Sequence, residues 1–94
     1  MRTKKSKPFT QAEERHVRAV KLLPCSVCSW PGPSDAHHIK QGQHSTNVAL
    51  CKDCHQGSFN GIHGQSRMWL VMKMDELAAL NSTLSRLRLQ EAAR

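Results

Sequence analysis

The sequence contains few of the residues that build a large hydrophobic core. It has no tyrosine, and its only aromatic residues are Phe9, Trp30, Phe59 and Trp69; hydrophobic residues occupy 38% of the 94 positions. A chain of this length forms a single domain that buries only about 60–65% of the surface exposed by its unfolded form. We therefore expect the core to need further stabilisation, and a structural metal ion is one source.

The sequence also lacks a long apolar run. The longest, MWLVM at residues 68–72, is far shorter than the roughly 20 residues that cross a bilayer. No apolar run follows the basic start of the chain, so we expect no secretory signal. These absences predict a soluble cytoplasmic protein without a membrane partner. In a reducing compartment, the four cysteines are expected to bind metal rather than to form disulfides.

Acidic residues are scarce. The sequence has seven Asp and Glu but 14 Lys and Arg, which gives a net charge of +7. This charge favours a polyanionic partner, DNA first, over a surface that is merely well solvated. No segment has the pattern of a base-reading helix, so we expect contacts mainly with phosphates and little sequence specificity. The basic residues expected to contact DNA are Lys4, Lys5, Lys7, Lys40, Lys52, Arg67 and Lys73.

The order of the patterns predicts an α+β fold. Residues 1–9 form a basic tail, and residues 10–94 form one domain. Thr10 and Glu13 match a capping box and predict a helix over residues 11–23, which Pro24 ends. Residues 36–40 and 47–51 have the character of two short strands joined by a tight loop, which predicts a hairpin.

The second half of the chain is mostly helical. We expect a short helix over residues 52–56, a glycine-rich loop over residues 57–64, and helix again from residue 65, where Trp69, Leu70 and Met72 pack beneath the site. Asp75 is a candidate N-cap for the last helix. The spacing of four leucines predicts one buried helical stripe, made of Leu77, Leu80, Leu84 and Leu87.

The cysteines form two pairs. Cys25 and Cys28 are separated by two residues, as are Cys51 and Cys54, and 22 residues lie between the pairs. This spacing is typical of a tetrahedral zinc site, because each tight turn directs two sulfurs at one ion. The sequence therefore predicts a structural zinc held by all four cysteines.

Two other interpretations of the cysteines are weaker. CKDCH at residues 51–55 matches a covalent haem attachment motif, but that motif belongs to exported proteins and would leave Cys25 and Cys28 without a role. A redox-active cysteine pair would be expected within a βαβ unit, and the chain has no such pattern.

Six histidines are many for a chain of this size, and His37, His38, His55 and His63 flank the cysteine pairs. If zinc pins the hairpin between the pairs, these four come close together and can form a second metal site. The simpler interpretation is that they are hydrogen-bonding partners of the zinc ligands or exposed loop residues. We prefer this simpler interpretation only for His16 and His44.

These residues resemble a known family. AHHI at residues 36–39, followed by NVALCKDCH at 47–55 and a later histidine, resembles the HNH endonucleases, also called His-Me finger nucleases. PCSVCSWPGPSDAHHIKQG and CHQGSFNGIHG resemble the Ref family, phage recombination-enhancement nucleases that act with RecA filaments. The resemblance covers about residues 24–85. It implies a zinc-stabilised, treble-clef-like ββα-metal core with helices at both ends.

The resemblance also implies roles for individual residues. His38 would be the general base, and Asn47 would tie the strands together and help to orient that base. His37, His55 and His63 would bind a catalytic divalent metal. The usual last ligand lies about one turn after the first helix histidine, where this chain has Phe59 and Asn60. Asn60 thus competes with His63 for this role, and we favour His63.

The catalytic ion and the partner follow from the same comparison. Three imidazoles favour zinc or another transition ion, whereas the resemblance implies Mg²⁺. The implied function is a metal-dependent DNA endonuclease related to prophage DNA recombination. Larger Ref proteins carry an extra basic N-terminal region that this chain lacks. The resemblance therefore supports a RecA filament as partner less strongly than it supports DNA cleavage.

Two alternatives belong to other classes. The first is a non-catalytic zinc-binding module for nucleic acid or protein. The second is a structural subunit of a phage recombination or packaging complex that docks through the leucine stripe. The four-histidine cluster distinguishes the endonuclease, because a binding module does not need it.

Overall fold

The computed structural model describes residues 9–92, with the side chains of residues 9–90. The predicted basic tail, with Lys4, Lys5 and Lys7, therefore lies outside the described residues, apart from Phe9. The fold is α+β, as predicted. Its elements are, in order, α1 (Gln11–Lys21), β1 (Asp35–His38), β2 (Asn47–Leu50), α2 (Lys52–Gln56), α3 (Arg67–Val71) and α4 (Glu76–Ala92).

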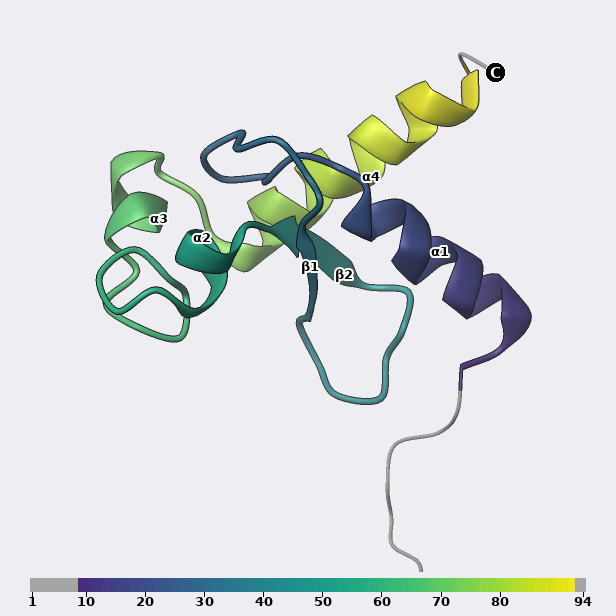
Figure 1. The fold of residues 1–94 in the computed structure, drawn as a ribbon, viewed down its shortest axis with the longest axis horizontal. Helices are drawn as coiled ribbons and strands as arrows, with labels where there is room; N and C mark the ends of the chain where they lie inside the picture. Colours follow the sequence, from purple (N-terminus) through teal and green to yellow (C-terminus); the bar gives the residue numbers. More distant parts are fainter. Residues whose placement is uncertain (1–8, 93–94) are drawn as a thin grey trace, which may run out of the picture.

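The two strands form the centre of the molecule. Figure 1 shows α1 on one side of the hairpin, α2 and α3 on the other side, and α4 running across from the α2–α3 side toward the α1 side. None of the helices within residues 9–92 is both long enough and apolar enough to cross a membrane.

Helix α1 begins at the predicted capping box. The Glu13 amide donates to Thr10 Oγ1 at 3.1 Å, and the Thr10 amide donates to Glu13 Oε1 at 2.9 Å. The regular helix ends at Lys21, two residues before the predicted end, because the Leu22 and Leu23 amides bond to carbonyls only three residues back. Val17, Val20 and Leu23 form its buried face.

The hairpin is antiparallel and pairs His37 with Val48 and His38 with Asn47. Side chains alternate between the two faces of a strand. Val48 and Leu50 therefore join the main hydrophobic cluster, which contains three of the cysteines and Trp69. Ala49 faces the other way and packs with Val20 and Leu23. The hairpin thus separates two small cores.

The second edge of β2 is covered by the Ser26 backbone and the Thr83 side chain, and no third strand pairs with it among the described residues. The Ser26 amide donates to the Ala49 carbonyl at 2.8 Å, and the Ala49 amide donates to Thr83 Oγ1 at 3.3 Å. Thr83 Oγ1 lies 2.7 Å from Ser26 Oγ and donates to the Ala79 carbonyl at 2.9 Å. One fully buried hydroxyl therefore joins the cysteine loop, β2 and α4.

The predicted leucine stripe is wrong in part. Leu77 is 73% exposed and Leu84 is 41% exposed, whereas Leu80 and Leu87 are partly buried. The buried face of α4 is centred on Ala79 and Thr83 instead, because small side chains let this helix approach β2 closely. The predicted N-cap is confirmed, since Asp75 Oδ1 accepts from the Ala78 amide at 2.8 Å.

The packing prediction for Trp69, Leu70 and Met72 is correct for only one of the three residues. Trp69 is buried beneath the cysteine cluster, and its Nε1 donates to the Cys54 carbonyl at 2.9 Å. Leu70 and Met72 are exposed. A helix of five residues presents only one narrow face to the core, and Trp69 fills it.

We predict that Thr83→Val lowers the free energy of unfolding by about 1–3 kcal/mol, because the isosteric side chain leaves buried polar groups of Ser26 and Ala49 unsatisfied. Urea denaturation of the zinc-saturated protein measures the change. Ser85→Val, an exposed position on the same helix, is the control. The double variant Ser26→Ala/Thr83→Val should lose less free energy of unfolding than the two single variants lose together. A Thr83→Val protein as stable as wild type would contradict this.

Candidate functional site

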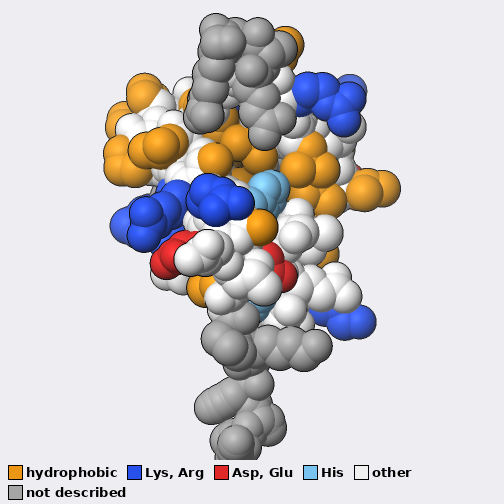
Figure 2. All heavy atoms as spheres, turned by 90° about the vertical axis from the view of Figure 1, so that its right-hand side faces the viewer, with side chains coloured by type: hydrophobic (Ala, Val, Ile, Leu, Met, Phe, Trp, Pro, Cys, Tyr) orange, Lys and Arg blue, Asp and Glu red, His pale blue; other side chains and the backbone are white. Residues whose placement is uncertain are grey.

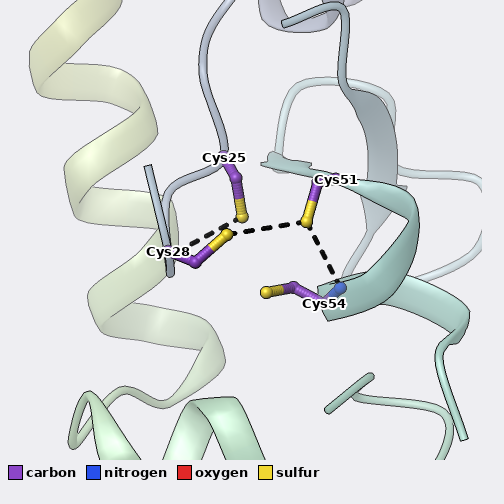
Figure 3. A group of neighbouring side chains, drawn as sticks. All are labelled: Cys25, Cys28, Cys51 and Cys54. Carbon is purple, nitrogen blue, oxygen red and sulfur yellow. Dashed lines mark hydrogen bonds between the residues drawn. The ribbon is translucent and has the colours of Figure 1, made fainter. Parts of the chain in front are cut away.

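The four cysteines converge on one point. Cys25 and Cys28 come from the loop after α1, whereas Cys51 and Cys54 lie at the start of α2, and their sulfurs point toward one another (Figure 3). The Cys28 and Cys51 sulfurs are 3.6 Å apart, and all four sulfurs lie within 4.8 Å of one another. Sulfurs bound tetrahedrally about 2.3 Å from zinc lie about 3.8 Å apart. The cluster can therefore hold a metal ion such as zinc.

Backbone amides support charge on these sulfurs. The Val27 and Cys28 amides lie 3.4 and 3.5 Å from the Cys25 sulfur, and the Cys54 amide lies 3.4 Å from the Cys51 sulfur. Burial opposes ionisation of Cys25, but hydrogen bonds from nearby amides lower its pKa overall. Burial raises the pKa of Cys28 and of Cys54. Three of the four cysteines are buried and Cys28 is half-buried, so a nearby cation would be needed to keep all four as thiolates, and a metal ion would supply that charge.

Three histidines form a second cluster on the hairpin side of α2. The ring centroids of His37, His55 and His63 lie 5.0–5.3 Å apart in each pair. One ring nitrogen from each lies within 4.8 Å of the other two. This arrangement fits a metal site with three imidazole ligands, a donor set that suits zinc and other transition ions.

The glycine-rich loop explains how His63 reaches His55 across eight residues. The Ile62 amide donates to the Cys54 carbonyl at 2.9 Å, and the His63 amide donates to the His55 carbonyl at 3.1 Å. The loop folds tightly on itself: a Cβ on Gly61 would lie 2.8 Å from the His55 carbonyl oxygen. Only glycine fits there, so the loop sequence directly determines the position of His63.

Two carboxylates hold the histidine rings from outside. His37 Nε2 lies 2.7 Å from Glu76 Oε2, and His55 Nδ1 lies 3.0 Å from Asp35 Oδ2. Metal-binding histidines commonly donate their second ring N–H to a carboxylate, which fixes the ring and makes the ligand more basic. The hydrogen bond from His55, followed by that from Lys52, lowers the pKa of Asp35 and keeps it ionised.

His38 lies on the opposite face of β1 from His37. Its Nε2 is 3.2 Å from His44 Nδ1, and Phe9 packs on the His44 ring at 4.1 Å between centroids. Burial, followed by the nearby charges of His44 and His37, lowers the pKa of His38 and favours the neutral imidazole. His38 and His37 nevertheless line the same cleft, because β1 is an edge strand among the described residues.

This histidine cleft has a volume of about 280 Å³, and the four histidines of the predicted site all line it. Its lining residues are Ala36, His37, His38, Gln41, His55, Gln56 and His63.

Asn47 is fully buried and lies opposite His38 in the hairpin. Its Nδ2 donates to the His44 carbonyl at 2.5 Å, so it holds the loop that carries the partner of His38. The Asn60 amide donates to Asp53 Oδ2 at 2.9 Å, and Asn60 is not among the residues that line the histidine cleft. Of the two residues left open for the last ligand position, His63 is the one that lines this cleft, with a ring nitrogen within 4.8 Å of nitrogens of His37 and His55.

The basic residues expected to contact DNA are dispersed. Lys40 and Lys73 are exposed, and the Lys52 ammonium bonds to Asp35 Oδ1 at 2.9 Å. The Arg67 guanidinium lies 5.3 Å from the centre of the Phe59 ring. His16 lies away from the clusters on α1, and its Nε2 is buried without a hydrogen-bond partner among the described residues.

No protein-family model, curated protein or solved structure matches this chain.

The sequence reasoning missed three residues of the site. Asp35 carried a local signal, since it precedes His37 by two residues and must share its strand face. The sequence favours a loop residue or a hydrogen-bonding partner of the zinc ligands for His44, whereas the side chain is buried and bonds to His38. Glu76 carried no local signal, because 39 residues separate it from His37.

We predict that Cys51→Ser loses the metal of the cysteine cluster and most of the stability of the fold, because three sulfurs hold the ion less well and the ion links two halves of the core. Elemental analysis and thermal denaturation measure both effects. Cys51 also caps α2 through its sulfur, so a serine keeps the cap and isolates metal loss. A variant with full metal content and an unchanged Tm would rule out the cysteine site.

We predict that Glu76→Gln weakens metal binding at the histidine cluster about 10- to 100-fold, because His37 loses the carboxylate that orients it. Titration with Zn²⁺ or Co²⁺, after the cysteine site is filled, measures the affinity. Glu14→Gln removes a carboxylate on the outer face of α1 and is the matched control. Equal metal affinity in the Glu76 and Glu14 variants would show that Glu76 does not support the site.

Proposed function

We propose that this protein is a metal-dependent DNA endonuclease of the HNH type. In this proposal the four cysteines hold a structural zinc, and His37, His55 and His63 hold a catalytic divalent ion, Mg²⁺ or Zn²⁺. The observation that carries it is the convergence of these three histidines in one cleft with His38. A protein that uses metal only for stability needs the cysteine cluster but not this second, open cluster.

The two clusters differ in a way that suits different roles. The four cysteines are buried or nearly so and supply four ligands, which is typical of a closed structural zinc site. The histidine cluster supplies three ligands, and His63 is exposed, which leaves room for water or a phosphate oxygen. Catalytic metal sites keep such an open position.

Hydrolysis of a phosphodiester requires a base for the attacking water and a stabiliser for the negative charge that develops on oxygen. A bound divalent ion supplies the charge stabilisation. Imidazole titrates near neutral pH and suits the role of base, and we assign that role to His38. His44 and Asn47 would act as positioning residues, because one bonds to His38 and the other holds the loop of its partner.

The charge of the protein supports a nucleic-acid substrate. The net charge is +7, and Figure 2 shows Lys and Arg side chains at several separate places on the face that contains α1. Dispersed cations fit phosphate contacts along a strand better than recognition of one base sequence. The resemblance to the Ref family alone supports a role in phage recombination, with a RecA filament as the partner.

One observation favours a second candidate, a non-catalytic zinc-binding module for nucleic acid or protein. His38 Nε2 is engaged by His44, and the ring leaves β1 on the face opposite the histidine cluster. If His38 does not reach the substrate, the second cluster would be a second structural metal site.

We predict that His38→Ala keeps both metals and DNA binding but loses cleavage by about 10²–10⁴-fold, the typical contribution of a general base. His63→Ala should instead lose the second metal, and cleavage with it, while the cysteine cluster keeps its ion. Metal content and cleavage of plasmid and single-stranded DNA with Mg²⁺ or Mn²⁺ separate the two roles.

His16→Ala is the control, because this histidine lies on α1 and is not among the residues lining the histidine cleft. Wild-type cleavage by His38→Ala would refute its assignment as base. Absence of cleavage by the wild type with every ion, with and without RecA filaments, would favour the binding module.

A further inference from the structure

Trp30 is a large aromatic side chain that the core does not use. It is 66% exposed, whereas Trp69 fills the space beneath the cysteine cluster. Beside Trp30 lies a cleft of about 340 Å³. The residues that line it are Cys28, Trp30, Pro33, Cys51, Lys52 and Asp53.

The segment that carries Trp30 is fixed at both ends. The Cys25 amide donates to the Trp30 carbonyl at 2.8 Å. Ser34 donates through its amide to the Lys21 carbonyl at 2.7 Å and through its hydroxyl to the Leu23 carbonyl at 2.6 Å. A Cβ on Gly32 would lie 2.8 Å from the Leu23 oxygen, so the segment also packs closely on the end of α1. The indole is therefore presented on a well-anchored backbone.

The Trp30 cleft and the histidine cleft are both lined by residues of α2. Lys52 and Asp53 line the first, whereas His55 and Gln56 line the second. A short chain of contacts joins them, since the Lys52 ammonium bonds to one oxygen of Asp35 and His55 bonds to the other. A strand bound at the histidines can thus continue past Lys52 to Trp30.

We propose that Trp30 and Pro33 form a stacking site for an unpaired nucleobase of the DNA strand that occupies the histidine cleft. Lys52 would lie beside a phosphate of the same strand. The faces of bases in a duplex are covered by their neighbours, so an exposed indole can stack only on a base that is single-stranded or turned out. The inference rests on the proposed function and specifies its substrate as single-stranded DNA or a strand with unpaired bases.

Tryptophan fluorescence tests the site without cleavage. Wild type is titrated with an oligothymidylate and with a fully paired, blunt-ended duplex, with zinc in the cysteine cluster and no added Mg²⁺ or Mn²⁺. Stacking should quench the exposed Trp30, whereas the buried Trp69 serves as an internal reference. Trp30→Phe should lose the quenching but keep most of the affinity for the single strand, because phenylalanine also stacks.

Trp30→Ala should lower the affinity for the oligothymidylate about 5- to 100-fold, the range expected for one stacked base, and change duplex affinity little. Fluorescence anisotropy of labelled DNA measures both. Leu70→Ala, which removes a similarly exposed apolar side chain from α3, is the matched control and should change neither. Zinc content and circular dichroism establish that the variants are folded.

An unchanged affinity of Trp30→Ala for the single strand would overturn the stacking site. An equal loss for single strand and duplex would also overturn it, because Trp30 would then belong to a general DNA-binding surface. Single-strand stacking in a protein that cuts no DNA would support this site while refuting the endonuclease, so the two failures are distinguishable.

Discussion

The position of the histidine cluster depends on the four cysteines, of which Cys25, Cys51 and Cys54 are buried and Cys28 is half-buried. Burial opposes charge on sulfur, yet backbone amides point at two of these sulfurs, and four thiolates so close together would repel one another. A bound cation would resolve this conflict and tie the loop after α1 to the start of α2. The cluster lies within the main hydrophobic core beside Trp69, so in a chain with four aromatic residues a metal ion there would add its stabilisation where apolar packing is concentrated.

The histidine cluster derives its geometry from the cysteine cluster. Cys51 follows β2 directly, and Cys54 precedes His55 directly, so the helical turn that places the second cysteine pair also places a histidine. The Cys54 carbonyl then accepts hydrogen bonds from Trp69 and from the Ile62 amide, which returns the glycine-rich loop to His55. Loss of the cysteine cluster would therefore also displace the histidines, even though the two clusters share no ligand.

Local patterns predicted the parts of the fold that depend on local chemistry. The capping box at Thr10, the hairpin and the cysteine spacing each involve residues close in sequence or a well-defined turn. The pairing of Glu76 with His37 depends on where α4 crosses the hairpin, and sequence periodicity does not determine that crossing. The leucine stripe failed for the same reason: hydrophobicity suggested large residues, whereas close approach to β2 selected Ala79 and Thr83.

The two adjacent histidines show how an edge strand can serve two purposes. Alternation places His37 beside His55 and His63, and it places His38 next to His44, on which Phe9 packs. One edge of β1 is paired with β2, and its other edge has no neighbouring strand among the described residues. The side chains of His37 and His38 can therefore both line the cleft beside this unpaired edge. Under the proposed function, a metal ligand and a general base on consecutive residues would thus be held by different neighbours: Glu76 bonds to His37, whereas His44 bonds to His38. A substitution at His44 would then alter the surroundings of the proposed base while leaving the hydrogen bond between His37 and Glu76 in place.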